Sequence, residues 1–308
     1  MLFLLSKTHA MKKERNKDKN LVRFDWAIKR LLRDKANFVI LEGFLASLLG
    51  RPIKILRILE SEGNKTHEHN KTNRVDLLAE DSDGANILIE VQNESESSYF
   101  HRMLFETSRI INEYLKEGEN YDKIKKVYSI NVVYFPLGAG NDYVYKGTTE
   151  FRGIHDNELL KLPGHMKVKY NALEISDLFP EYFILRVNDF DKWSKTPLDQ
   201  WMYFLSTSTI PDDADAPGLK EANEKLRVAY LPQEERHAYY EHLRAMNSWN
   251  EQIEDAIDRG RFEGRVEGRN EEKIEIAKKM LRKGKSLKEI SELTDLSEEE
   301  ISSISMSI

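Results

Sequence analysis

Two carboxylates inside short apolar runs constrain this chain more than any other feature of its sequence. Residues 86–92 read Asn-Ile-Leu-Ile-Glu-Val-Gln and alternate as a β-strand does, which puts Glu90 and Gln92 on the same face. Residues 75–79, just before a turn-rich linker, form a second apolar run that contains Asp76. Carboxylates in apolar strands are costly unless something positive neutralises them, so this hairpin predicts a site for a divalent cation.

A plainer interpretation of the hairpin remains open from the residues alone. Asp76 would then cap a turn at the end of a strand, and Glu90 with Gln92 would lie on a solvated face of the sheet. Against this interpretation, Leu78 and Leu88 share the faces of the two acids, so those faces are not uniformly polar. We therefore favour the functional site.

The composition excludes several classes of site. The 308 residues allow one large domain or two smaller ones, and none of them is cysteine. The absence of cysteine excludes disulfides, thiolate zinc sites and cysteine nucleophiles, and it fits a reducing, cytoplasmic location. No apolar run approaches the roughly 18 residues of a membrane span, so we expect no membrane segment.

Charge is unevenly distributed along the chain. The net charge of −6 argues against a globally basic nucleic-acid binder. Residues 12–35 nevertheless contain ten Lys and Arg against four Asp and Glu, whereas residues 286–308 contain one Lys against six acids. The basic N-terminal region is therefore the part of the chain whose charge favours contact with phosphates.

Helices and strands alternate through residues 20–180, which indicates an α/β domain with a mixed sheet after a basic arm at residues 1–19. Asp25 is the expected N-cap of a first helix that starts at Trp26. Further helices are predicted at residues 36–49 and 98–116. The predicted strands lie at residues 53–61, 75–79, 86–92, 126–135, 143–151 and 166–175.

No strand signal follows Pro180, so we expect an all-helical region at residues 181–258 and a further helical segment at residues 259–308. Within the last segment Gly, Arg and Glu each recur every four residues and would form three stripes on a helix. The stripes are Gly260, Gly264 and Gly268, Arg261, Arg265 and Arg269, and Glu263, Glu267 and Glu271. Two interpretations stay open, a close pair of helices from two copies of the chain or a semi-flexible linker of biased composition.

The end of the chain predicts a small three-helix unit that resembles a helix-turn-helix. Two capping boxes, Ser286 with Glu289 and Ser297 with Glu300, mark the starts of its second and third helices. The third helix begins with three glutamates, which would face phosphates if it entered a DNA groove. We therefore favour a structural or protein-contact role for this unit.

The hairpin and its flanks resemble a known family. Asp76, thirteen residues, Glu90, one residue and Gln92 are similar to the PD-(D/E)XK nuclease signature, in which a lysine usually stands where this chain has Gln92. With the segments at residues 25–32 and 276–290, the chain resembles the recombination-promoting nuclease family, a transposase family of that superfamily, from Asn20 to the end. The resemblance implies a restriction-endonuclease-like core and a Mg²⁺-dependent DNA endonuclease, with Mn²⁺ as a substitute, linked to recombination or a mobile element.

The resemblance also implies roles for particular residues. Asp76, Glu90 and the backbone carbonyl of Val91 would hold the ion, and Gln92 would position water without adding a positive charge. Glu42 is similar to an extra acidic residue that some members of the superfamily bring to the metal, but a solvated position is the more usual one for a glutamate on a helix, and we favour it.

Other polar residues carry weaker signals. Lys29, Arg30, Arg102 and Arg109 are candidates for contact with DNA phosphates, and ordinary surface positions explain them as well. His67 and His69 have the spacing of metal ligands, but a polar loop without a third ligand is the simpler interpretation. A catalytically weak or inactive DNA-binding protein on the same fold is the alternative function, because the usual lysine is missing. Homo-oligomerisation through the C-terminal helices is a further expectation.

Overall fold

The computed structural model describes residues 21–59, 76–113, 120–191 and 196–305. The chain forms two compact units, residues 1–236 and residues 237–308. The first unit is an α/β fold, and the second is helical. This confirms the predicted fold class, an α/β core with a mixed sheet followed by a helical C-terminal region.

The first unit is built on a sheet whose six strands are ordered β1-β2-β3-β4-β6-β5. The strands are β1 (Ile55–Leu59), β2 (Leu77–Asp81), β3 (Asn86–Gln92), β4 (Val127–Val133), β5 (Val144–Gly147) and β6 (Glu181–Arg186). β1, β2 and β3 pair antiparallel, β3, β4 and β6 pair parallel, and β5 pairs antiparallel with β6. β3 and β4 lie inside the sheet and are buried on both faces, as parallel strands usually are.

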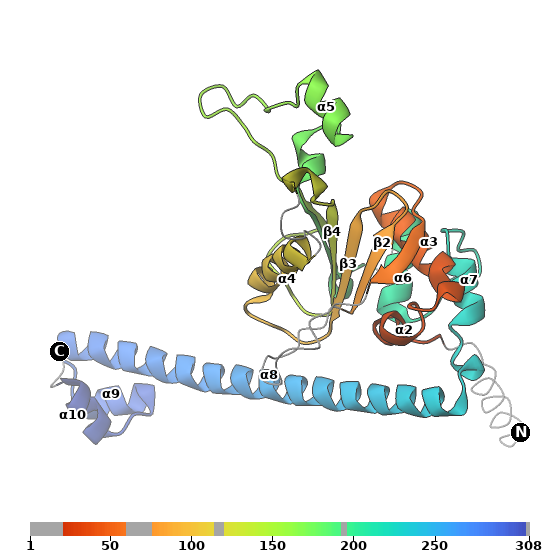
Figure 1. Ribbon diagram of the computed structural model, residues 1–308. Coiled ribbons are helices and arrows are strands. Elements are labelled where there is room, and N and C mark those ends of the chain that lie inside the picture. Colours follow the sequence, from red (N-terminus) through yellow and green to blue (C-terminus); the bar gives the residue numbers. More distant parts are fainter. Residues whose placement is uncertain (1–20, 60–75, 114–119, 192–195, 306–308) are drawn as a thin grey trace, which may run out of the picture. The chain divides into compact units, whose positions relative to one another are not determined.

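Helices cover both faces of this sheet (Figure 1). They are α2 (Phe24–Arg30), α3 (Phe38–Leu49), α4 (Tyr99–Glu113), α6 (Pro197–Thr207) and α7 (Leu219–Lys225), whereas α5 (Gly164–Tyr170) lies in the segment between β5 and β6, away from the sheet. α4 packs Ile110 on Leu78, Leu88 and Val127 of the strands. Figure 1 shows α2, α3, α6 and α7 together on the other side, where Phe24, Phe44, Trp201 and Phe204 form an aromatic cluster.

The predicted hairpin forms, and its turn shows why. The Asp81 carboxylate accepts hydrogen bonds from the backbone N–H groups of Asp83 and Ala85, at 3.0 and 2.8 Å. Gly84 has φ +83°, a left-handed conformation that glycine adopts without strain. The turn therefore fixes the register of β2 on β3, with Leu78 opposite Leu88.

The strand expected at residues 166–175 is wrong, because residues 164–170 form helix α5. The strand-like sequence of residues 166–175 is the basis of that prediction. Val168 is instead 84% exposed, and no described strand pairs with this segment. Asn171, at φ +50°, ends the helix in a left-handed conformation.

The expected all-helical region at residues 181–258 is wrong at its start, because residues 181–186 form β6 beside β4. This run is short and has a charged residue at each end, so the sequence pattern did not indicate a strand. Tertiary contacts satisfy both charges. Lys126 and Lys146 pair with Glu181 at 3.1 Å each, and Arg186 donates to the Gly140 carbonyl at 3.1 Å. The sheet therefore continues past the predicted boundary at residue 180.

The first helix begins earlier than its predicted cap. α2 starts at Phe24, so Asp25 lies inside its first turn instead of at the N-cap. Asp25 is 1% exposed and accepts hydrogen bonds from Arg23 Nε and Asn93 Nδ2, both at 3.1 Å. This buried carboxylate ties α2 to the residue that follows β3.

The helical unit consists mainly of α8 (Gln233–Arg282), α9 (Leu287–Thr294) and α10 (Glu298–Ser305). Ala277, Ile290 and Ile301 form its small core. Both predicted capping boxes are confirmed by hydrogen bonds from Glu289 N to Ser286 Oγ and from Glu300 N to Ser297 Oγ. Among the described helices, none combines the length and the apolar character that crossing a membrane requires.

The glycine stripe lies within α8, a single continuous helix of 50 residues. A Cβ atom added at Gly260, Gly264 or Gly268 would meet no atom within 4 Å. The stripe therefore does not mark a break in the helix, and its surface is open within one copy of the chain.

Candidate active site

The hairpin brings the two predicted carboxylates together. β2 and β3 pair Leu77 with Ile89, so Asp76, one position before β2, lies opposite Glu90. Asp76 Oδ2 accepts a hydrogen bond from the Val91 N–H at 2.7 Å, which fixes the orientation of that carboxylate. The side chains of Asp76 and Glu90 are only 12% and 6% exposed.

The environment of the pair disfavours two free negative charges. Burial, followed by the charge of Asp76, raises the pKa of Glu90 to about 8. Burial also raises the pKa of Asp76, against the opposing effect of Lys29. Glu90 Oε1 is buried and has no hydrogen-bond partner among the described residues. An unpartnered carboxylate oxygen beside a second carboxylate fits a divalent cation, which would satisfy both groups.

Two cationic side chains from different helices contact the pair. Lys29 of α2 lies 3.1 Å from Asp76 Oδ1, and Arg102 of α4 lies 3.4 Å from Glu90 Oε2. Arg102 also pairs with Glu96 at 3.1 Å. Lys29 and Arg102 were predicted to contact DNA phosphates, and the structure places both against the carboxylates.

Sequence reasoning missed two residues beside Glu90. Asn131 of β4 is the register partner of Glu90 in the sheet and is 1% exposed. Tyr99 of α4 donates its hydroxyl to Asn131 Oδ1 at 3.2 Å, and burial together with the charge of Glu90 raises the pKa of Tyr99. Asn131 carried the same signal as the two acids, a polar residue inside a β-branched strand.

Gln92 stands at the end of β3, two residues after Glu90, as the alternation predicts. Its side-chain amide donates to the Glu94 carbonyl at 3.3 Å. The side chain at the usual lysine position is therefore bonded to the following loop.

The structure does not bring Glu42 to the pair. Glu42 Oε1 accepts from the Ile55 N–H at 2.9 Å, and Oε2 pairs with Lys54 at 3.1 Å. This helix residue of α3 thus caps the start of β1. Within the described part of the chain, no cluster of three or more His, Cys, Asp or Glu residues has the arrangement of a metal site.

The remaining arginine candidates are engaged elsewhere. Arg30 pairs with Glu235 at 3.3 Å, and Arg109 pairs along α4 with Glu106 and Glu113 at 2.9 and 3.3 Å. His67 and His69 lie outside the described residues.

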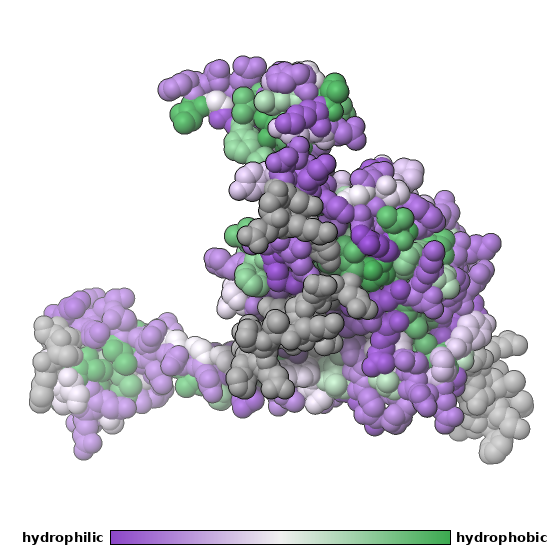
Figure 2. Space-filling view, in the orientation of Figure 1, coloured by the Kyte–Doolittle hydropathy of each residue, from purple (hydrophilic) through white to green (hydrophobic). Residues whose placement is uncertain are grey.

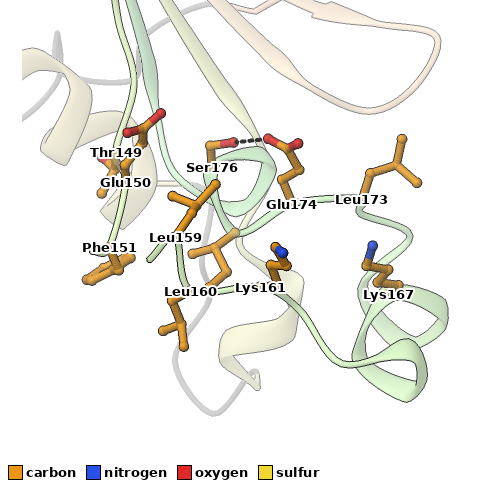
Figure 3. A pocket seen from close by; sticks show the side chains of 11 residues that line it. Thr149, Glu150, Phe151, Leu159, Leu160, Lys161, Lys167, Leu173, Glu174 and Ser176 are labelled. Atoms are coloured by element: carbon orange, nitrogen blue, oxygen red, sulfur yellow. Dashed lines mark hydrogen bonds between the residues drawn. The ribbon is translucent and has the colours of Figure 1, made fainter. Parts of the chain in front are cut away.

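The segment between β5 and β6 forms a hollow (Figure 3). Figure 3 shows Leu159, Leu160 and Leu173 in it, with Lys161 and Lys167 nearby. This segment exposes several apolar side chains among hydrophilic ones, as Figure 2 shows. The residues that line this hollow include no facing pair of buried acids.

Comparison with known protein families gives two matches. The family model described as PD-(D/E)XK nuclease family transposase matches residues 22–256, which is most of the chain. The model described as Rpn/YhgA-like nuclease family, C-terminal HTH domain, matches residues 270–306. No curated protein and no solved structure matches the chain. The two matches together confirm the resemblance found in the sequence, and the second coincides with the capped three-helix unit.

Proposed function

The chain belongs to the PD-(D/E)XK nuclease family of transposases, and from this premise we propose that it is a metal-dependent DNA endonuclease. Asp76 and Glu90 would hold Mg²⁺, or Mn²⁺ in its place, together with a backbone oxygen such as the Val91 carbonyl. The observation that carries the proposal is the buried Asp76–Glu90 pair with an unpartnered Glu90 oxygen. Mg²⁺ commonly binds one or two protein carboxylates and completes its shell with water and phosphate oxygens.

The proposed reaction is hydrolysis of a phosphodiester bond. A water oxygen forms a bond to phosphorus, the bond to the leaving oxygen breaks with its electron pair, and the proton that water loses is balanced by one that the leaving oxygen gains. A divalent ion at the carboxylates would lower the pKa of a bound water and offset charge that develops on the phosphate.

The protein's own side chains supply position and charge around this reaction. Val91 N–H holds one oxygen of Asp76 and leaves the other directed to Lys29. Arg102, clamped between Glu90 and Glu96, offsets the charge of the buried glutamate. Gln92 carries no charge, so in this proposal it contributes at most a hydrogen bond to water.

DNA is the proposed substrate, and the supporting observations are the names of the two matching families. A role in recombination or in the movement of a mobile element follows from the same family membership. The cysteine-free composition fits a reducing cytoplasm, where such a substrate would be found. A second copy of the chain as a partner through α8 is part of the proposal, because large apolar side chains such as Trp249 and Phe262 are exposed along that helix.

A DNA-binding protein without cleavage activity is the second candidate. One observation favours it. Lys29 and Arg102 already pair with the carboxylates, so the site is partly neutralised without a metal ion.

Cleavage of supercoiled plasmid with Mg²⁺ or Mn²⁺ tests the proposal. Asp76→Asn and Glu90→Gln keep the shapes of the side chains and remove the charges that would bind the ion. We expect each variant to cleave at least about 100-fold more slowly than the unchanged protein, the scale of losing one group that stabilises transition-state charge.

Glu80→Gln is the matched control, because Glu80 is also a buried acid of β2 and pairs with the cations Arg57 and Lys125 away from the site. It should cleave as the unchanged protein does. Binding of DNA without cleavage under any metal would reject the endonuclease and leave the non-catalytic candidate. Equal cleavage by all variants would reject Asp76 and Glu90 as the catalytic residues.

A further inference from the structure

We propose that Lys29 of α2 supplies the ammonium group that in the usual signature comes from the lysine two residues after the glutamate. This inference rests on the proposed endonuclease function and names a further residue that touches the reacting groups. The juxtaposition that carries it is Lys29 Nζ at 3.1 Å from Asp76 Oδ1, in a chain that has Gln92 at the signature position.

Gln92 does not replace the signature lysine. Its amide donates to the backbone carbonyl of Glu94 at 3.3 Å, and an amide brings no positive charge. A site that hydrolyses a phosphodiester needs charge opposite the developing phosphate oxygens and a donor that orients the incoming water. These needs must be met by another residue close to Asp76.

Lys29 is the cation whose exposure suits this role. Its side chain is 49% exposed while the Asp76 carboxylate beside it is 12% exposed, so the ammonium lies on the open side of the pair. Arg102, the other cation at the site, is only 20% exposed and is shared between Glu90 and Glu96. Substrate that reaches the carboxylates from solvent would therefore meet Lys29.

The fold fixes Lys29 at this place through contacts on both sides. Asp25, one helical turn earlier, is buried and bonded to Asn93 just after β3. Arg33, one turn later, donates to the backbone carbonyl of Asp76 at 2.6 Å. α2 and the residues just after it are thus bonded to the residues that flank β2 and β3, and these contacts hold Lys29 beside Asp76.

The proposed role is that of a hydrogen-bond donor with a fixed charge. The three N–H groups of the ammonium can donate to Asp76, to the attacking water and to a phosphate oxygen. Lys29 keeps its protons throughout, so no bond to Lys29 forms or breaks during hydrolysis.

Lys29→Met removes this donor, and Lys54→Met is its matched control. Lys54 makes the same kind of ion pair, at the same 3.1 Å, with a carboxylate of the same 12% exposure, Glu42, away from the site. We expect Lys29→Met to lower kcat by about 100- to 1000-fold, with KM for DNA within about twofold, because one transition-state donor is lost. Lys54→Met should leave both constants unchanged.

Mn²⁺ binding, measured by calorimetry without DNA, gives a readout that does not depend on cleavage. Loss of a cation beside Asp76 should leave Mn²⁺ affinity unchanged or raise it, because like charges disfavour each other. A fall in Mn²⁺ affinity together with kcat would overturn the proposal, since Lys29 would then only hold Asp76 in place. A rise in KM alone would overturn it in favour of a plain DNA contact.

Two outcomes and one further variant separate the possible failures. If the unchanged protein cleaves, Glu90→Gln does not, and Lys29→Met still cleaves fully, the Lys29 role is rejected while the endonuclease stands. If the unchanged protein does not cleave, both proposals are rejected. Lys29→Gln, which keeps a donor but no charge, serves if the methionine variant does not fold, and full activity in it would equally reject the role.

Discussion

Glu90 combines three properties that a surface carboxylate does not have. It is buried in a central strand, it faces a second acid across the hairpin, and one of its oxygens has no partner among the described residues. Burial and the charge of Asp76 together raise its pKa to about 8. Without a metal ion, therefore, burial and the charge of Asp76 favour the protonated form of Glu90, and a bound metal ion would have to displace this proton.

This raised pKa predicts how stability depends on pH in the absence of metal. The pKa of Glu90 in the folded state lies above its ordinary value of 4.5, so between these values the folded chain binds a proton that the unfolded chain has lost. The free energy of unfolding should consequently fall as pH rises from about 5 to about 8. Urea denaturation in buffer with a chelator, at several pH values across this window, measures the slope.

Glu90→Gln should flatten that slope, because the amide does not titrate. Glu80→Gln is the control, since ion pairs with Lys125 and Arg57 lower the pKa of Glu80 and move its effect below this window. Equal slopes in Glu90→Gln and the unchanged protein would contradict the assignment of the proton to Glu90.

At the scale of elements, the packing around a helical glycine determines whether a larger residue would fit at its position. Gly43 of α3 packs so closely on the loop before α7 that an added Cβ would lie 2.2 Å from the Pro217 carbonyl oxygen. The contact is with backbone, which cannot move aside as a flexible side chain would. α3 and α7 therefore depend on the absence of a side chain at this position.

The same substitution should have opposite effects in two helices. Gly43→Ala should lower the free energy of unfolding by about 1–3 kcal/mol, the usual cost of overpacking a core. Gly264→Ala should raise the helical stability of α8 by up to about 1 kcal/mol, because alanine favours a helix and the site is open. Urea denaturation followed by circular dichroism measures both, and a Gly43→Ala protein as stable as the parent would show that the α3–α7 contact is not tight.

For the whole molecule, the exposed apolar surface of α8 bears on whether two copies of the chain associate. Large apolar side chains are exposed along this helix, although such side chains are usually buried against a partner. They are Trp249, Ile253, Ile257, Phe262 and Val266. The neighbouring glycine stripe would permit a close approach of a second helix, with arginines of one copy against glutamates of the other. These features support association of two copies through α8.

Deletion of residues 259–308 tests this association. We expect the full chain to have the mass of a dimer or larger in light scattering and the shortened chain to have that of a monomer, because the stripe and the helical tail are gone. The double variant Phe262→Ser and Val266→Ser separates loss of the surface from loss of the tail. If neither change alters the mass in solution, association through the glycine-striped part of α8 is wrong.

By itself, the sequence determined those features that depend on residues close together in the chain. The hairpin of β2 and β3, the capped helices α9 and α10, and the facing positions of Asp76 and Glu90 all follow from alternation, turn residues and polar residues inside apolar strands. These signals lie within a few residues of one another, so no knowledge of distant contacts was needed.

Tertiary structure alone decided the rest. Strand β6 forms because lysines from β5 and from the residue before β4 neutralise Glu181. Lys29 meets Asp76 because α2 docks on the hairpin, and Glu42 is excluded because β1 begins against it. Contacts between residues far apart in the chain set these outcomes, and a local pattern carries no information about which distant side chain will arrive.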